Sequence, residues 1–383
     1  MDAKVLLKAC EEAGIDLFTG VPDSQLAGLC DTLYARFGTD GSHHVVAANE
    51  GNAIGLAAGH YLASGRPALV YMQNSGLGNA VNPLASLMDE EVYGIPCLLV
   101  IGWRGEPSVK DEPQHVKQGK ITLPQLELLG VPYRIIDKAT SEADFAAIFA
   151  ETQKTLQSGH TAALVIRKGG LTCETKPTYA NPYPMTRERA AEILLEEMNG
   201  EDIVVSTTGK LSREIFELRE KHQEGHRKDF LTVGSMGHAS SIAMGIALEK
   251  PGRTVWCLDG DGAAVMHLGA MDVLGQRKLP NMRHVVINNG AHETVGGMPV
   301  CSGQTSFCAL AEAAGYPLVL SAGDEASLRG AMKQMKDAAC LCFLEVRCAL
   351  GARSNLGRPT TTPKENRDAF MSFVMEAEKE KQP

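Results

Sequence analysis

The chain has 383 residues, of which 44% are hydrophobic and 22% charged, and its net charge is −9 at pH 7. This length allows two α/β domains of ordinary size, and the acidic balance argues against nucleic-acid binding. The ten cysteines include no Cys-x-x-Cys pair, and no apolar run approaches the roughly 20 residues that span a bilayer. We therefore expect a cytoplasmic protein that binds neither nucleic acid nor membrane.

The first elements predict a helix, a strand and a polar loop. Residues 3–13 have helical periodicity, and residues 15–20 have the composition of a strand. The loop that follows, Val21-Pro22-Asp23-Ser24, leads into a helix predicted over residues 25–37. Taken alone, this loop is a turn that caps the helix.

Two further predicted strands also end in polar residues. Residues 45–48 form a short strand, and Glu50 then opens a helix rich in Ala and Gly. A first-turn glutamate ordinarily stabilises the helix dipole. The strand over residues 67–72 ends in Gln73-Asn74-Ser75-Gly76-Leu77-Gly78-Asn79, whose glycines predict a tight turn into the next helix.

A buried strand over residues 96–102 precedes a polar, Gly- and Pro-rich stretch, residues 103–120, which predicts a flexible surface loop. A histidine in such a loop can exchange protons near neutral pH, and its cations can meet an anionic substrate. The residues concerned are Arg104, Lys110, His115 and Lys117. Residues 161–166 are predicted to close the sheet, and a Pro-rich linker follows.

The second half opens with a helix over residues 186–198, capped by Thr186. The strand over residues 203–206 ends in Thr207-Thr208-Gly209-Lys210-Leu211-Ser212, a turn whose amides can approach phosphate oxygens although it is not a Walker loop. The strand over residues 230–233 leads into Gly234-Ser235-Met236. A methionine at that place would by default fill the core.

The most specific motif joins two neighbouring strand ends. The strand over residues 255–258 runs into Gly260-Asp261-Gly262, and the strand over residues 285–287 ends in Asn288-Asn289. Both ends are predicted at the carboxyl edge of one parallel sheet, where such sheets bind ligands. Carboxylate and amide oxygens suit Mg²⁺, and the glycines let the backbone approach a phosphate. The glycine-rich stretch 290–299 predicts a lid, in which His292 and Glu293 are candidate proton donors.

Together these motifs resemble the thiamine diphosphate-dependent 2-oxo acid decarboxylases, and among them the phosphonopyruvate and sulfopyruvate decarboxylases. The resemblance implies two doubly wound parallel-sheet domains of the α/β class. The pyrimidine-binding domain would span residues 1–175 and the diphosphate-binding domain residues 186–383, joined by a linker at 176–185. The short linker leaves no room for the middle domain of larger relatives.

The resemblance also implies roles for individual residues. Glu50 would hydrogen-bond N1′ of the aminopyrimidine and favour the imino tautomer that activates the cofactor. Met236 would support the bent cofactor, and the metal would be held by Asp261, Asn289 and the carbonyl of Ala291, with Asn288 as the competing ligand. Ser24, His115 and His292 would act on the substrate. The other expected cofactor contacts are Asn74, Gly76, Gly209, Lys210, Ser212, Ser235, Gly260, Gly262 and Ala263.

The activity implied is the decarboxylation of 3-phosphonopyruvate to phosphonoacetaldehyde and CO₂, with thiamine diphosphate and Mg²⁺, in phosphonate biosynthesis. A homodimer or higher homo-oligomer is implied as well, with Glu50 and Asp261 of different chains serving one site at the subunit interface. Three alternatives stay open: the same chemistry on sulfopyruvate, another 2-oxo acid decarboxylase or carboligase, and a non-catalytic binding protein with this fold.

Overall fold

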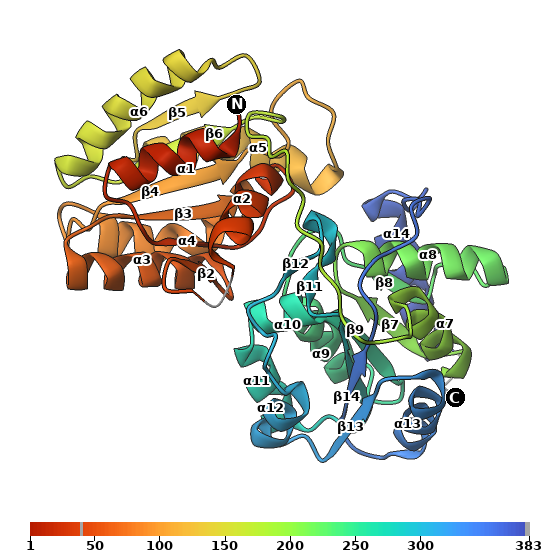
Figure 1. Cartoon of the computed structure of the whole chain (residues 1–383). Coiled ribbons are helices and arrows are strands. Elements are labelled where there is room, and N and C mark those ends of the chain that lie inside the picture. The colour runs from red at the N-terminus through yellow and green to blue at the C-terminus, as the bar shows by residue number, and fades with distance from the viewer. Residues whose placement is uncertain (39–40, 380–383) are drawn as a thin grey trace. The chain divides into compact units, whose positions relative to one another are not determined.

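The computed structural model of the chain describes residues 1–38 and 41–379. These residues form two compact units, Met1–Thr178 and Tyr179–Pro383, of which the last four residues lie outside the described part. Each unit is built on a six-stranded parallel sheet with helices on its faces (Figure 1). The predicted class, doubly wound α/β, is confirmed for both units.

The first unit places its strands in the order β2-β1-β3-β4-β6-β5. The chain leaves β1 for β2 on one side and returns to β3 on the other, so the crevice above β1 and β3 is a topological switch point, where such sheets bind ligands. The strands are β1 Phe18–Gly20, β2 His44–Val46, β3 Ala68–Gln73, β4 Cys97–Gly102, β5 Tyr133–Ile136 and β6 Ala162–Ile166. The helices are α1 Ala3–Glu12, α2 Ala27–Phe37, α3 Glu50–Ser64, η1 Asn74–Gly76, α4 Leu77–Pro83, the π-helical turn η2 Leu84–Met88, α5 Pro113–Leu128 and α6 Glu142–Gln157.

Two expectations for this unit are wrong. The strand β6 does not close the sheet, because β5 pairs outside it and forms the edge. The segment 103–120 is not a flexible loop throughout, because α5 begins at Pro113, whose fixed φ suits the first turn of a helix. Gly119 of this helix lies so close to Gly105 that a Cβ on Gly119 would stand 1.6 Å from the Gly105 carbonyl oxygen.

The second unit places its strands in the order β13-β14-β10-β9-β7-β8. The strands are β7 Ile203–Ser206, β8 Asp229–Leu231, β9 Val255–Gly260, β10 Met282–Asn288, β13 Leu318–Ala322 and β14 Cys342–Arg347, with a small hairpin of β11 Ala291–His292 and β12 Met298–Pro299. The helices are α7 Arg187–Glu197, α8 Lys210–His222, α9 Ala239–Glu249, α10 Asp261–Met266, α11 Gly269–Arg277, η3 Glu293–Val295, α12 Phe307–Ala314, α13 Glu325–Asp337 and α14 Pro363–Lys379.

The side chains of this sheet alternate between two cores. One core packs the sheet against α7, α8 and α13, and the other packs it against α9, α11, α12 and α14. The expected pairing of β9 with β10 is confirmed, with Val285 opposite Leu258 and Ile287 opposite Gly260. The ends of both strands therefore meet at the carboxyl edge, next to the switch point between β7 and β9.

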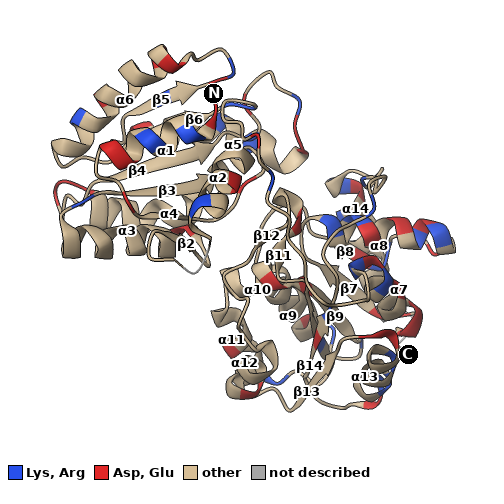
Figure 2. Ribbon diagram, in the orientation of Figure 1, with Lys and Arg blue, Asp and Glu red and all other residues tan. Residues whose placement is uncertain are grey.

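Positively and negatively charged side chains alternate along the outer helices of this unit. Blue and red residues alternate on α7 and α8, whereas the central strands carry few charges (Figure 2). Many are paired, as in the contacts of Arg189 with Glu192 and Glu325 and of Lys221 with Glu192. No helix among the described residues is long and apolar enough to cross a membrane.

Candidate active site

Glu50 is a buried carboxylic acid at the first position of α3. Asn49 caps this helix with its side chain, which fixes where the helix begins and aims Glu50 inward, with only 4% of its surface exposed. Asn79 of α4 donates a hydrogen bond of 2.7 Å to Glu50 Oε2. A Cβ at Gly76 would stand 2.3 Å from Glu50 Oε1, so only glycine fits there. Burial raises the pKa of Glu50 although the Asn79 bond opposes the rise.

A second polar cluster lies where β1 and β4 end. Asp23 is buried and accepts a 2.6 Å bond from Gln73, and burial raises its pKa against the effect of that bond. The neighbouring Ser24 is exposed, and its hydroxyl accepts a 2.9 Å bond from Nη1 of Arg104. Asp111 binds the other side of the same guanidinium through Nε and Nη2. The Arg104 side chain is thus held in a fixed direction.

The predicted residues Asn74 and His115 belong to the scaffold around that arginine. Asn74 donates to the Arg104 carbonyl and to Thr122 at 2.8 Å each, so its amide ties η1 to α5. His115 is buried in the first turn of α5, and no partner for its Nδ1 is found among the described residues. Burial, and then the nearby Arg104 charge, lower the pKa of His115 to about 4. Its imidazole is therefore neutral at pH 7.

In the second unit, Asp261 sits at the start of α10 with 5% of its surface exposed. Its Oδ1 accepts from the Gly262 amide at 2.8 Å, and its Oδ2 accepts from the Gly290 amide at 2.7 Å. Burial raises the pKa of Asp261 to about 7, although these amides lower it. A buried carboxylate of this kind is stabilised by a cation.

The asparagines at the end of β10 share backbone amide donors with Asp261. The Gly290 amide also donates to Asn288 Oδ1 at 3.0 Å, and the Ala291 amide donates to Asn289 Oδ1 at 3.1 Å. Their amide nitrogens are anchored differently: Asn288 donates to Glu345 of β14, and Asn289 donates to Glu293. Asn289 is the more buried of the two.

The third expected metal ligand is the carbonyl of Ala291. The carbonyls on either side of it, of Gly290 and His292, accept from Val300 and Gly297 in the β11–β12 hairpin. Because successive residues of a strand turn their backbone groups to opposite sides, the Ala291 carbonyl points away from this hairpin. The Ala291 amide points to the same side as the Ala291 carbonyl, and it donates to Asn289 Oδ1. The Ala291 carbonyl therefore lies on the side where Asp261 and Asn289 meet.

Glu293 connects this cluster to two cations. It accepts from Asn289 at 3.0 Å and from the Gly351 amide at 2.9 Å, and it lies 3.2 Å from Lys210 Nζ and 3.9 Å from Arg187. All four partners are donors, so these contacts suit an ionised Glu293 better than a proton donor. His292 packs its ring against Gly262, and burial lowers the pKa of His292 to about 4.

The predicted diphosphate loop after β7 has a tight turn at Gly209, with φ of +107°, and α8 then begins at Lys210. Among the described residues no side chain caps this helix or α9, which begins at the same sheet edge. Free amides at helix starts attract anions. The Ser212 hydroxyl, by contrast, is buried and bonds Ser206 and the Thr207 carbonyl, so it supports the turn rather than facing a ligand.

The Ser235–Met236 loop follows β8. Ser235 adopts a positive φ of 49°, which is uncommon for a residue other than glycine and indicates a constrained turn. Gly237 lies against α10, where a Cβ would stand 2.6 Å from the His267 ring. Met236 is only partly buried. Its side chain is therefore available to a ligand, unlike a methionine that fills the core.

These residues fit the groups that the sequence leads us to expect. In the second unit a buried carboxylate with a raised pKa, amide and carbonyl oxygens and the starts of α8 and α9 match a hard divalent cation bound to a diphosphate. In the first unit the Glu50 side chain packs directly against Gly76, which holds its buried carboxyl group beside the turn after β3. Gly260 and Ala263 belong to the same strand-to-helix joint as Asp261.

Several supporting residues were not predicted from the sequence. Asn79 contacts the predicted site residue Glu50 from 29 positions away along the chain, and Thr122 contacts Asn74 from 48 positions away. Asp23 accepts from Gln73, which is 50 positions away. Arg187 holds Glu214 in a buried pair, with contacts of 2.6 and 2.7 Å, and lies beside Glu293. Of these residues, only Asp23 could have been found from the sequence, because it lies next to Ser24 in the same loop after β1.

Comparison with known families agrees with this geometry. Residues 3–127 match the family "Thiamine pyrophosphate enzyme, N-terminal TPP binding domain", and residues 208–346 match "Thiamine pyrophosphate enzyme, C-terminal TPP binding domain". No third domain is matched between them. The chain belongs to the thiamine diphosphate-dependent decarboxylase family, and it is a 2-oxo acid decarboxylase.

Among its relatives is a phosphonopyruvate decarboxylase of Streptomyces viridochromogenes, 34% identical over 94% of this chain and 92% of that protein. Another, from Streptomyces hygroscopicus, is 32% identical over 98% of this chain and 94% of the relative. A sulfopyruvate decarboxylase of Methanosarcina acetivorans is 27% identical over 78% of each chain.

Proposed function

We propose that this protein decarboxylates 3-phosphonopyruvate to phosphonoacetaldehyde and CO₂, as a step of phosphonate biosynthesis. The observation that carries the proposal is the similarity, at 34% and 32% identity over nearly the whole chain, to two proteins named as phosphonopyruvate decarboxylases. The sulfopyruvate decarboxylase is less similar and covers less of the chain. Sulfopyruvate is therefore the second candidate substrate.

The cluster of Ser24, Arg104 and Asp111 supports a substrate with a tetrahedral anion. Asp111 orients the guanidinium from one side, which leaves Nη1 and the Ser24 hydroxyl together at the exposed end. A guanidinium and a hydroxyl are suitable donors to a phosphonate oxygen. We propose that this pair binds the phosphonate, with Lys110 and Lys117, both exposed, as further cations near it.

We further propose the roles of the buried acids. Thiamine diphosphate, when bound, supplies a nucleophilic carbon and accepts the electrons that the departing CO₂ leaves behind. Glu50 would exchange a proton with the aminopyrimidine at its Oε1, while Asn79 fixes its Oε2. Asp261, Asn289 and the Ala291 carbonyl would hold Mg²⁺, and Met236 would support the cofactor ring.

The proton that completes the reaction has two candidate carriers, His115 and His292. Both are neutral at pH 7, since their pKa values are lowered to about 4. Each would therefore act as a neutral N–H donor or through a bound water rather than as an imidazolium. Cytoplasmic location and a homo-oligomer, in which Glu50 and Asp261 of different protomers serve one cofactor, complete the proposal.

The test is CO₂ release by the purified protein with Mg²⁺ and thiamine diphosphate, offered phosphonopyruvate, sulfopyruvate and pyruvate in parallel. We expect the highest kcat/KM for phosphonopyruvate. A preference for sulfopyruvate would replace the proposed substrate and keep the proposed roles. CO₂ from none of the three would refute the assignment to this substrate class.

An Arg104→Met variant tests the proposed anion contact. Losing a charge-assisted hydrogen bond costs about 1.5–3 kcal/mol, so kcat/KM for phosphonopyruvate should fall by roughly 10- to 150-fold, with little change for pyruvate. Asp111 would still accept from the Gly105 and Glu112 amides, which preserves the loop. The matched control is Arg134→Met, because Arg134 also pairs with a carboxylate, Glu151, on the surface of the same unit. Equal losses with both substrates would contradict this assignment.

A further inference from the structure

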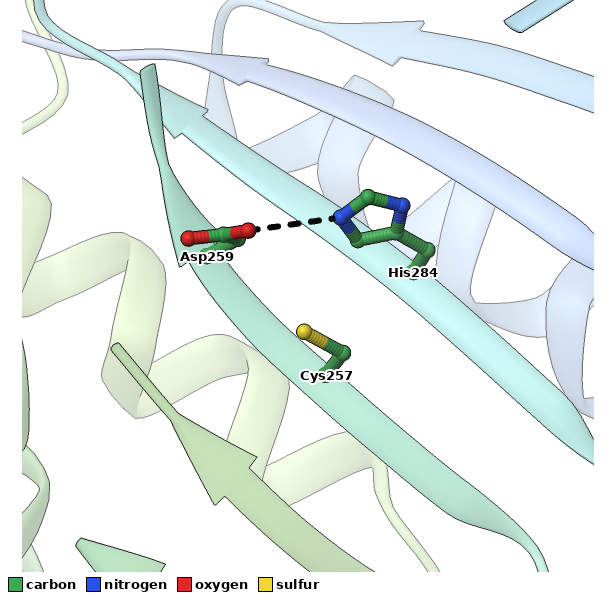
Figure 3. A group of neighbouring side chains, drawn as sticks. All are labelled: Cys257, Asp259 and His284. Carbon is green, nitrogen blue, oxygen red and sulfur yellow. Dashed lines mark ion pairs between the residues drawn. The ribbon is translucent and has the colours of Figure 1, made fainter. Parts of the chain in front are cut away.

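Three side chains outside the proposed active site face one another in the interior of the second unit. Cys257 and Asp259 project from one face of β9, two residues apart, and His284 projects from the same face of β10 (Figure 3). His284 is the register partner of Cys257. All three are fully enclosed, with exposed fractions of 0%, 1% and 0%. One ligand atom from each lies within 4.8 Å of those of the other two.

Two polar atoms of this cluster are buried without a hydrogen-bond partner among the described residues. Asp259 Oδ1 accepts from the Gly260 amide at 2.9 Å, but Asp259 Oδ2 has no hydrogen-bond partner among the described residues. His284 Nε2 is likewise without a hydrogen bond there, and it lies 3.7 Å from Asp259 Oδ2. That separation is too long for a direct hydrogen bond. Two buried polar atoms therefore face each other across a gap.

We propose that Cys257 Sγ, Asp259 Oδ2 and His284 Nε2 bind a divalent transition-metal ion of the zinc class. A sulfur, an oxygen and an imidazole nitrogen form a donor set typical of Zn²⁺, whereas Mg²⁺ avoids thiolates. Three atoms within 4.8 Å of one another all lie within about 2.8 Å of a common point, and Zn²⁺ needs about 2.0–2.3 Å. Shifts of about 0.5–0.8 Å per side chain would close the site.

The charge and the surroundings of the cluster also suit this ion. A thiolate and a carboxylate balance the two charges of the metal, so the filled site is neutral in an apolar core. Tyr316 bonds the other ring nitrogen of His284, Nδ1, at 3.1 Å, which is the support that a metal-binding histidine usually has. Phe343 packs edge-on against the same ring, with centroids 5.4 Å apart.

The proposed ion would link the two strands whose ends carry the Asp261 and Asn289 motifs. Asp259 lies two residues before Asp261, and its Oδ1 already holds the amide between them. Because the three ligands are fully enclosed, the metal would enter as the unit folds and would contribute to its stability. This site is distinct from the proposed Mg²⁺ site and does not depend on which substrate the enzyme uses.

The experiment measures the metal content of the untagged full-length protein, produced in medium with added zinc and desalted after exposure to a mild chelator. Elemental analysis should find about one zinc per chain. Protein grown with cobalt should show thiolate-to-Co²⁺ charge-transfer absorption. A folded wild-type protein without tightly held zinc or cobalt would overturn the proposal and leave a bound water as the bridging atom.

The variant Cys257→Ala should lose the zinc and the cobalt absorption. The control is Cys97→Ala, since Cys97 is also a fully buried strand cysteine, but in the first unit. It should keep both signals. If Cys257→Ala retains the metal, the ion is bound elsewhere and the assignment is wrong. The wild-type measurement stands even if that variant fails to fold.

Discussion

The substitution Glu50→Gln tests the proposed activation of the cofactor most directly. Glutamine has nearly the same shape, and its oxygen can still accept the hydrogen bond that Asn79 donates to Oε2. The amide then occupies the place of Oε1 beside Gly76, where it cannot exchange a proton. Positioned proton transfer contributes roughly 10²- to 10⁴-fold to rate, so we expect kcat to fall by that factor. In free energy this is about 3–5 kcal/mol of transition-state stabilisation.

The same substitution should stabilise the cofactor-free protein. Burial raises the pKa of Glu50 above its ordinary 4.5, so the folded state disfavours its ionised form. The resulting loss of stability is absent at pH values below the pKa of Glu50 in the unfolded chain. It grows as the pH rises through the pKa of Glu50 in the folded protein. Glu50→Gln should therefore raise the Tm of the cofactor-free protein at pH 7. This difference should vanish toward pH 4.

The assays are CO₂ release at saturating substrate and thermal unfolding with and without thiamine diphosphate and Mg²⁺. The control is Glu142→Gln, because Glu142 is also the first residue of a helix behind a side-chain cap, but is exposed. It should leave the rate unchanged and should not raise the Tm, because Glu142 stabilises the start of its helix. The cofactor should still raise the Tm of Glu50→Gln. Unchanged turnover by Glu50→Gln would refute the reasoning about Glu50.

Three further predictions concern the metal ligands and the oligomer. The pKa of Asp261 is raised to about 7 from 3.8, which costs the cofactor-free protein up to about 4 kcal/mol as pH rises between these values. Asp261→Asn should remove that pH dependence and abolish the Mg²⁺-dependent Tm shift; a retained shift would refute the metal assignment. Asn289→Ala should weaken Mg²⁺-dependent cofactor binding at least tenfold more than Asn288→Ala, as titration calorimetry can measure, and the reverse order would exchange their roles. Mixing inactive Glu50→Gln and Asp261→Asn chains under exchange should restore part of the activity, whereas no recovery would contradict sites shared between protomers.

The sequence predicted the strand ends of the second unit well because their signal is local. Continuous apolar runs such as Val255–Leu258 and Val285–Ile287 are typical of strands buried inside a parallel sheet, and the turn residues follow immediately. Strands joined by a short helical crossover are usually neighbours, and β9 and β10 are. The place of Asp261 beside the asparagines follows from that pairing.

The contacts that hold Glu50 could not be predicted in the same way. Asn79 reaches it because α3 packs against α4, and nothing in the residues near either side chain encodes that packing. The edge strand β5 was missed because it is short and half-exposed, with Arg134 in its centre. In the segment 103–120 the abundance of polar residues outweighed the helix-start signal of Pro113.

The two units share one physical feature. Each buries a carboxylate whose pKa is raised: Glu50 in the first unit and Asp261 in the second. The hydrogen bonds that these two carboxylates accept include those from the Asn79 amide and the backbone amides of Gly262 and Gly290, which are all neutral donors. At these two sites the neutral donors offset only part of the cost of burying a charge, whereas a divalent cation at Asp261 and a protonated ring nitrogen at Glu50 would offset more of it. The free energy that burial costs the cofactor-free protein would then be recovered when the cofactor binds. Replacing either acid by its amide should therefore stabilise the cofactor-free protein and weaken cofactor binding at the same time.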